Sequence, residues 1–88
     1  MNKNKDNKYF YITNFYTATF LLAKDLELAN IDRTNPSRCQ FAFVDTPQRR
    51  KLLEAFNFAK ENSPEIMIDA RKLITAIKSL KDKLYQNV

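Results

Sequence analysis

The sequence of 88 residues contains no glycine. Glycine is the residue that most readily takes a left-handed backbone conformation and lets the backbone lie against a phosphate. Its absence excludes the phosphate-binding loop of nucleotide hydrolases and the glycine-rich turn of dinucleotide-binding folds. Other residues must close the turns and helix ends, and Asn30, Asn35 and Asn62 stand where glycine is common.

The side chains that usually carry catalysis and metal binding are also scarce. The chain has no histidine and one cysteine, so it lacks the commonest general base, a thiolate metal cluster and an internal disulfide. Cys39 stands in an apolar stretch, where a thiol is expected to be an unreactive core residue. The carboxylates show no spacing typical of a catalytic pair or a metal site. We therefore expect a protein that is not an enzyme and that binds no cofactor and no metal.

The longest apolar stretch, residues 15–23, is about half as long as a bilayer-spanning helix. No small-residue cleavage site follows it, so a secretory signal is not expected. Because no internal disulfide can form, the expected location is the reducing cytoplasm, without membrane association.

The beginning of the chain predicts a strand followed by a helix. Residues 9–12 are aromatic and β-branched, which indicates a short strand. A helix is expected over residues 15–25, with Thr13 or Asn14 as its N-cap. Its apolar residues spread over more than one stripe, so most of its circumference should be buried. In place of glycine, Asp25 or a distorted turn must close it.

The middle of the chain predicts a hairpin. Residues 26–34 alternate imperfectly and suggest a strand, and residues 35–37, Asn-Pro-Ser, form the clearest turn. Residues 39–44 form the best strand pattern in the sequence. Because both faces of that strand are largely apolar, it should lie inside the sheet.

Two further helices are expected in the second half. Thr46 as N-cap and Pro47 at the first helical position predict a helix that ends at residues 62–64. Residues 65–68 form either a short edge strand or an extended linker. Asp69 should cap the third helix. The expected buried stripes are Leu52, Leu53, Phe56 and Ala59 in the second helix, and Leu73, Ile77, Leu80 and Leu84 in the third.

These elements predict an α+β fold with a small two- or three-stranded antiparallel sheet and three helices packed mainly on one face. Residues 1–8 are asparagine- and lysine-rich and are expected to be a flexible basic tail. Residues 9–88 are expected to form a single compact domain.

The charge of the chain points to its partners. The formal net charge is +5, and the excess lies in residues 1–8 and 69–88 at the two ends. A basic balance favours anionic partners such as nucleic acid, nucleotides or acidic protein surfaces. The alternative is that the charge only keeps a small domain soluble.

Two basic clusters are candidate anion-binding sites. Arg49, Arg50 and Lys51 occupy the first turn of the second expected helix, where the helix dipole disfavours cations and an anion would be stabilised. On the third helix the candidates are Arg71, Lys72 and Lys78; Arg71 and Lys78 share a row with Lys81, Ile74 and Tyr85. The alternative for both clusters is an ordinary solvated helix surface.

Five aromatic residues follow the lysine-rich segment: Tyr9, Phe10, Tyr11, Phe15 and Tyr16. On an exposed strand such residues stack on the bases of single-stranded nucleic acid. Because a chain of this length needs its largest side chains for a core, we expect them to be core residues, with some tyrosine hydroxyls at the surface.

Three segments carry a resemblance to a known family: residues 15–24 (FYTATFLLAK), residues 41–46 (FAFVDT) and residues 68–73 (IDARKL) with Leu80-Lys81. They resemble a family of short bacterial and phage proteins described only as a domain of unknown function. The resemblance covers about residues 9–86, and it departs at Asp25, where the family has a Lys-Gly pair. It implies an accessory or host-interaction role in a mobile element rather than a metabolic one.

The leading functional hypothesis is a non-enzymatic phage or mobile-element accessory protein. It would bind nucleic acid or a nucleotide through Arg49, Arg50, Lys51, Arg71, Lys72 and Lys78, whose side chains supply charge and hydrogen bonds to phosphate. The alternative is an inhibitor or adaptor that binds an acidic surface of a host complex, such as a defence system, through an edge strand or a helix face. Pairing of that edge would also produce a homodimer.

Overall fold

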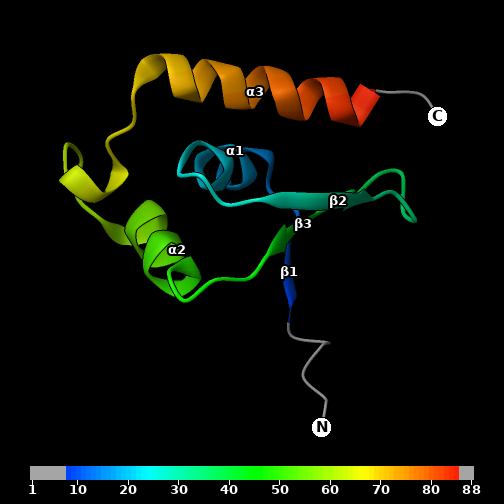
Figure 1. Ribbon diagram of the computed structural model, residues 1–88, viewed down its shortest axis with the longest axis horizontal. Helices are drawn as coiled ribbons and strands as arrows, with labels where there is room; N and C mark the ends of the chain where they lie inside the picture. The colour runs from blue at the N-terminus through cyan, green and yellow to red at the C-terminus, as the bar shows by residue number, and fades with distance from the viewer. Residues whose placement is uncertain (1–7, 86–88) are drawn as a thin grey trace, which may run out of the picture.

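The computed structural model describes residues 8–85 (Figure 1). Its elements follow in the order β1 (Tyr9–Ile12), α1 (Phe15–Ala23), β2 (Leu28–Asp32), β3 (Gln40–Val44), α2 (Arg49–Phe58), the short 3-10 helix η2 (Pro64–Ile66) and α3 (Ala70–Tyr85). Within these residues, three α-helices and a three-stranded antiparallel sheet confirm the predicted α+β class. The predicted flexible tail lies outside the described residues, except for Lys8.

Strand β3 occupies the centre of the sheet, whose order is β1-β3-β2. It runs antiparallel to both neighbours and forms a hairpin with β2, so the predicted interior strand and hairpin are confirmed. Residues Phe41 and Phe43 of β3 point to one face of the sheet and are almost completely buried. On β1, Phe10 lies opposite Phe43 and so points to the same face. This face carries the core.

The hairpin is closed by side chains rather than by glycine. The Oδ1 atom of Asn35 accepts hydrogen bonds from the backbone N–H of Ser37 at 3.1 Å and from its hydroxyl at 2.9 Å, which confirms the predicted turn. Beyond β2, Arg33 donates a hydrogen bond to the carbonyl of Lys83 in α3. The hairpin is thereby connected to the last turns of α3.

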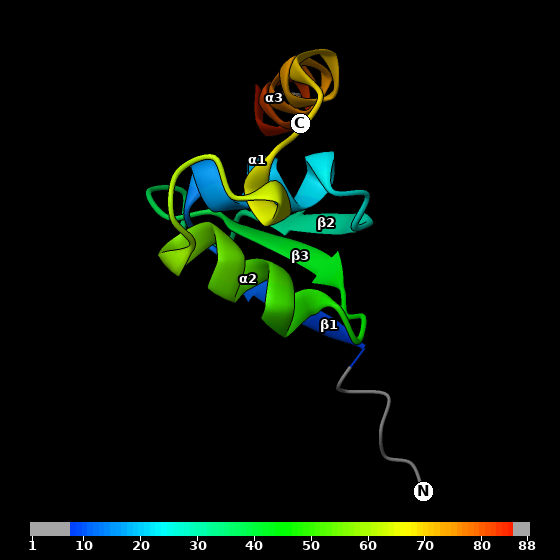
Figure 2. The ribbon, with the colours of Figure 1, turned by 90° about the vertical axis from the view of Figure 1, so that its left-hand side faces the viewer.

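Helix α1 lies at the centre of the molecule. The sheet covers one side of it, α3 lies across it on another, and α2 contacts it on a third (Figures 1 and 2). Ala18, Leu21 and Ala23 are buried, and Leu80 of α3 is buried in the same cluster as Leu21. The predicted burial of most of the first helix is confirmed, although Tyr16 is 74% exposed.

The ends of α1 are closed by short polar side chains. Asn14 is the N-cap, and its Oδ1 accepts a hydrogen bond from the backbone N–H of Thr17 at 3.0 Å. At the other end, Asp25 takes a left-handed conformation with φ of 73°. A residue with that conformation ends a helix as glycine commonly does, so the expected closure at Asp25 is confirmed.

The start of α2 differs from the prediction. The helix begins at Arg49 rather than at Pro47, and Thr46 is not its N-cap. The backbone N–H of Arg49 bonds to the carbonyl of Thr46 at 3.1 Å, and the Thr46 hydroxyl accepts from the N–H of Gln48 at 3.3 Å. These bonds form a separate turn before the helix, which delays its start by two residues.

The predicted buried stripe of α2 is only partly present. Leu52, Leu53 and Ala59 are half-buried and Phe56 is 36% exposed, so no residue of this helix is fully buried. After α2, residues 64–66 form η2, and the chain continues as a linker to α3. Of the two alternatives for residues 65–68, the structure therefore has the linker. Asp69 caps α3 as predicted, because its carboxylate accepts from the backbone N–H of Arg71 at 2.7 Å.

The aromatic residues at the start of the chain divide between the core and the surface. Phe10 and Phe15 pack against the core, but Tyr9 and Tyr11 are 44% and 54% exposed. The expectation of core residues with some tyrosine hydroxyls at the surface is therefore confirmed for Phe10 and Phe15 and is wrong for Tyr9, Tyr11 and Tyr16. In β1 the side chains alternate, so the tyrosines point away from the face that carries Phe10.

Candidate functional site

The structure separates the two predicted basic clusters. Arg49, Arg50 and Lys51 begin α2, whereas Arg71, Lys72 and Lys78 lie on α3. In Figure 2, α2 and α3 lie at opposite sides of the molecule, with α1 and η2 between them. The six residues therefore form two surfaces rather than one.

Arg49 is bound within the protein. Its Nε and Nη2 atoms donate to the two carboxylate oxygens of Asp45 at 3.0 and 2.9 Å, and its guanidinium lies 5.0 Å above the ring of Phe10. The hydrogen bond from Arg49 holds the pKa of the Asp45 carboxyl below its usual range and raises the pKa of the guanidinium. The anion expected beside this basic turn is therefore the side-chain carboxylate of Asp45, within the same protein.

The neighbouring residues of that turn are free of such bonds. Arg50 and Lys51 are exposed, and neither forms an ion pair with any residue in 8–85. Arg50 borders a shallow depression of about 390 Å³ with Asp45, Thr46, Pro47 and Arg49. Only these two members of the α2 cluster are available to an external anion.

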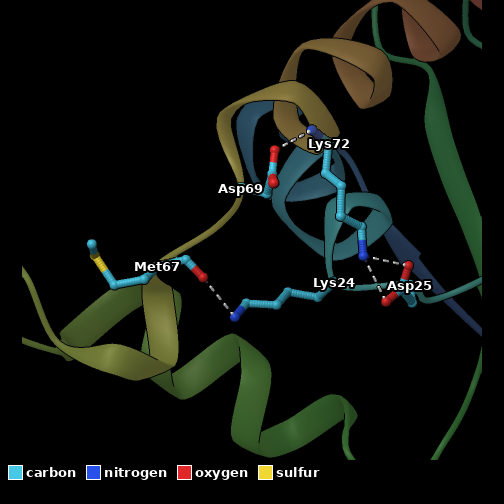
Figure 3. Close-up of polar contacts among 5 residues, drawn as sticks. All are labelled: Lys24, Asp25, Met67, Asp69 and Lys72. Carbon is cyan, nitrogen blue, oxygen red and sulfur yellow. Dashed lines mark hydrogen bonds and ion pairs between the residues drawn. The ribbon is translucent and has the colours of Figure 1, made fainter.

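Lys72 also has an internal partner. Its Nζ atom lies 2.9 Å from both carboxylate oxygens of Asp25, which joins the first turn of α3 to the end of α1 (Figure 3). Next to it, Lys24 donates to the carbonyl of Met67 at 3.1 Å, and its Nζ lies 5.7 Å from the ring centre of Phe20. The two lysines attach the linker and the start of α3 to α1.

Arg71 and Lys78 remain exposed on α3, without an ion pair among the residues that the structure describes. One turn of helix is about 3.6 residues, which places both in a row with Ile74, Lys81 and Tyr85. All members of this row are exposed. We call these five residues the α3 row.

An apolar groove lies beside the α3 row. Its volume is about 520 Å³, and its walls come from α1, α2, η2, the following linker and α3. The rings of Phe20 and Phe56 pack together with centres 4.8 Å apart at its wall. Its lining residues are Tyr16, Thr19, Phe20, Phe56, Ile66, Met67, Ile68, Leu73 and Ile77.

Sequence reasoning did not identify this groove. Phe56, Leu73 and Ile77 were assigned to buried stripes, and the linker residue Met67, which is 58% exposed, had no assigned role. Residues 65–68 contain more apolar side chains than a polar linker needs, and this excess is the signal in the sequence that could have indicated the groove. Whether those apolar side chains line a groove depends on the distance between α2 and α3, which the sequence does not give.

The described residues offer little for catalysis. Residues 8–85 contain no group of three histidine, cysteine, aspartate or glutamate side chains placed to hold a metal ion. Cys39 is half-buried and packs against the core, where the apolar pattern of its stretch had placed it. No helix in this part of the chain is long and apolar enough to cross a membrane.

The fold and surfaces define a small α+β domain with one apolar groove and two separate basic clusters among its described residues. The chain belongs to the family described as Domain of unknown function (DUF5659), whose model matches residues 7–86. The resemblance to a family of unknown function is confirmed to that extent. No curated protein and no solved structure matches the sequence significantly.

Proposed function

We propose that this protein is a non-enzymatic binding protein that takes the apolar face of an amphipathic helix of a partner protein in the α1–α2–α3 groove. The observation that carries the proposal is the groove itself, which has about 520 Å³ of space and eight apolar or aromatic side chains among its nine lining residues. Amphipathic helices bind such grooves by inserting apolar side chains from successive turns.

The charge next to the groove specifies an acidic partner. Ile74 is the neighbour of the lining residue Leu73, about 100° around α3, so the α3 row borders the groove on that side. This row contributes Arg71, Lys78 and Lys81, and Lys24 lies beside the lining residues Phe20 and Met67. A helix with glutamate or aspartate beside its apolar face would pair with these cations.

The resemblance to short bacterial and phage proteins supplies a biological setting. In that setting the protein is an accessory protein of a phage or mobile element that acts in the cytoplasm on a host complex, such as a defence system. It functions without a cofactor.

The test is a binding measurement with a fluorescent amphipathic peptide that carries leucine on one face and glutamate beside it. The Met67→Glu variant places a charge in the groove and should weaken binding by about tenfold or more, because a buried carboxylate would be unpaired. Phe58→Glu is the matched control, since Phe58 is 82% exposed and lies outside the groove lining. Equal affinities of the Met67→Glu variant and the unmodified protein, or no saturable binding of this peptide, contradict the proposal.

A second candidate function is the binding of nucleic acid or another anion through the basic helix surfaces. The observation in its favour is that Arg50, Lys51, Arg71 and Lys78 are exposed and form no ion pair within residues 8–85. The internal pairs of Arg49 and Lys72 remove these two from the proposed set. Charge reversal at Arg71 and Lys78 should abolish a binding that weakens steeply with salt.

A further inference from the structure

The face of the sheet that points away from the helices carries an aromatic pair. Tyr9 and Tyr11 alternate with Phe10 and Ile12 in β1, so the two tyrosines share that outer face. They are 44% and 54% exposed, whereas the core cluster on the other face contains or contacts all three helices. Within the described chain, no helix packs on this outer face.

The centre of this outer face is Ala42, a small residue that is 4% exposed. Tyr11 lies opposite Ala42 of β3, and Asn30 of β2 lies opposite Ala42 on its other side. Alanine leaves no bulk between the tyrosine and the asparagine, which stand about 10 Å apart across two strand spacings. The sheet thus carries, in order across this face, the ring of Tyr11, the small side chain of Ala42 and the exposed amide of Asn30.

Cations gather at the end of β1 that carries Tyr9. Lys8 directly precedes Tyr9, and its carbonyl accepts a hydrogen bond from the backbone N–H of Asp45 at 2.7 Å. Asp45 also borders the depression that Arg50 lines, so Lys8 and Arg50 flank the same end of the sheet. The Asp45 carboxylate there is already paired with Arg49.

We propose that this outer face binds single-stranded nucleic acid, with bases stacked on Tyr9 and Tyr11 and phosphates held by Lys8 and Arg50. Stacking needs open base faces, which a duplex conceals, so a flat aromatic surface selects single strands. Successive tyrosines on one face of a strand stand about 6.7 Å apart, which gives each ring room for its own base. The Asn30 amide can both donate to and accept from a base edge.

This surface is separate from the groove of the proposed function. It also differs from the second candidate function, because it specifies a single strand and a surface on the sheet rather than on α3. Two acidic residues lie across the central strand from the tyrosines: Glu27, whose carbonyl accepts from the backbone N–H of Val44 at 2.9 Å, and Asp32, which lies on β2 opposite Gln40. The Asp32 carboxylate already has a partner, because it accepts a hydrogen bond from the backbone N–H of Thr34 at 2.9 Å.

The experiment measures binding of a labelled single strand of about 12 thymidines by fluorescence anisotropy, with the 12-base-pair duplex as comparison. Tyr9→Ala and Tyr11→Ala should each weaken binding of the single strand about fivefold or more, because each removes one stacked base. Tyr16→Ala and Tyr85→Ala are matched controls, since these tyrosines are 74% and 78% exposed but lie on helices. Tyr9→Phe and Tyr11→Phe keep the rings and should keep the affinity.

Intrinsic fluorescence gives a second readout. The chain has four tyrosines and no tryptophan. Replacing Tyr16 and Tyr85 by phenylalanine leaves Tyr9 and Tyr11 as its tyrosines, and stacked thymidines should quench their emission. Lys8→Ala should lower the slope of log affinity against log salt by about 0.7, as expected for one lost phosphate contact on a single strand.

The inference is overturned by equal affinity for the duplex and the single strand, by unchanged affinity in the Tyr9→Ala/Tyr11→Ala variant, or by no saturable binding at low salt. Loss of binding in an Arg71→Glu/Lys78→Glu variant with full retention in the tyrosine variant also overturns it, and assigns nucleic acid to α3 instead. None of these outcomes bears on the peptide groove, which is tested with Met67→Glu.

Discussion

Two residues in left-handed conformations show how a chain without glycine closes its turns. Asp25 has φ of 73° at the end of α1, and Asn62 has φ of 70° between α2 and η2. Asparagine and aspartate tolerate this region better than other residues with a Cβ atom, because their short polar side chains bond locally. Asp25 has a second use, since its carboxylate receives Lys72. At the residue scale, the turns are therefore closed by residues that also contribute polar contacts.

Replacing Asn62 should show this conformational demand directly. Asn62→Ala should lower the free energy of unfolding by about 1 kcal/mol, because alanine is strained at positive φ, whereas Asn62→Gly should stay within about 0.5 kcal/mol of the unmodified protein. Urea unfolding measures both. Asn57→Ala, an exposed position inside α2, is the control and should not destabilise. Equal effects of alanine at the two positions would contradict the account.

The Asp45–Arg49 pair predicts a pH dependence. The pKa of Asp45 is lowered in the folded protein, so the pair stabilises the fold above the unfolded pKa of about 4, and this stabilisation is lost as the pH falls through the folded value. For a pair at the surface its size is about 1 kcal/mol or less. Between about pH 5 and pH 3, the Asp45→Asn variant should lose less stability than the unmodified protein in urea unfolding. Parallel losses in the two proteins would show that Asp45 does not contribute.

At the scale of elements, α2 is the helix held most weakly. None of its residues is fully buried, and its N-cap Gln48 forms no side-chain cap bond. It is attached through the Arg49 stack on Phe10, the packing of Phe56 on Phe20, and Leu52 and Leu53, which are partly buried against the core. Helix α3, in contrast, begins with a capped turn and buries Ala76 and Leu80. Since α2 forms one wall of the groove, its weak attachment bears on the groove's stability.

Hydrogen exchange should show this difference between helices. Backbone amides of α2 should exchange faster than those of α1 and of the middle of α3, because few buried contacts oppose local opening. Addition of the acidic amphipathic peptide should slow exchange in α2 if the groove is its site. Equal protection of α2 and α1 in the free protein would contradict the weak attachment.

At the scale of the whole molecule, one core joins elements from the two ends of the chain. Leu80 of α3 is completely buried in the cluster that contains Leu21 of α1 and Phe43 of β3. Among the described residues, helix α3 packs mainly against α1 and bonds to the hairpin end, so this core contact helps to fix its position (Figure 1). The same packing leaves the groove on one side of α1 and the tyrosine face on the far side of the sheet.

The core contact predicts one strongly destabilising substitution. Leu80→Ala should lower the free energy of unfolding by about 2–5 kcal/mol, a large share of the stability of so small a domain. Ile74→Ala on the same helix is the control, since Ile74 is 53% exposed and should cost less than about 1 kcal/mol. Denaturant unfolding compares them. Similar losses at the two positions would mean that α3 is not held through Leu80.

Local chemistry made several elements predictable. The strand at residues 9–12, the caps Asn14 and Asp69 and the interior position of β3 all follow from residues within a few positions of one another. The start of α2 was not predictable in this way. A Thr-Pro pair is a common helix start, and what displaced it was a turn bonded between Thr46 and Arg49.

The candidate sites show more clearly the difference between features that neighbouring residues determine and features that depend on the fold. The basic residues were identified from charge alone, but only the folded chain places Asp45 against Arg49 and Asp25 against Lys72. The outward direction of Tyr9 and Tyr11 depends on which face of the sheet the helices cover. A period of two separates the faces of a strand without indicating which one is buried.

The sequence by itself thus determined the α+β class, the caps of α1 and α3, the Asn-Pro-Ser turn and the basic character of the chain, because these depend on neighbouring residues and on composition. The tertiary structure decided which cations remain free, that apolar residues of four distant segments form a groove, and that two tyrosines lie on an uncovered face. Those features arise from contacts between segments up to about fifty positions apart, such as Asp25 with Lys72, and such contacts leave no local pattern in the sequence.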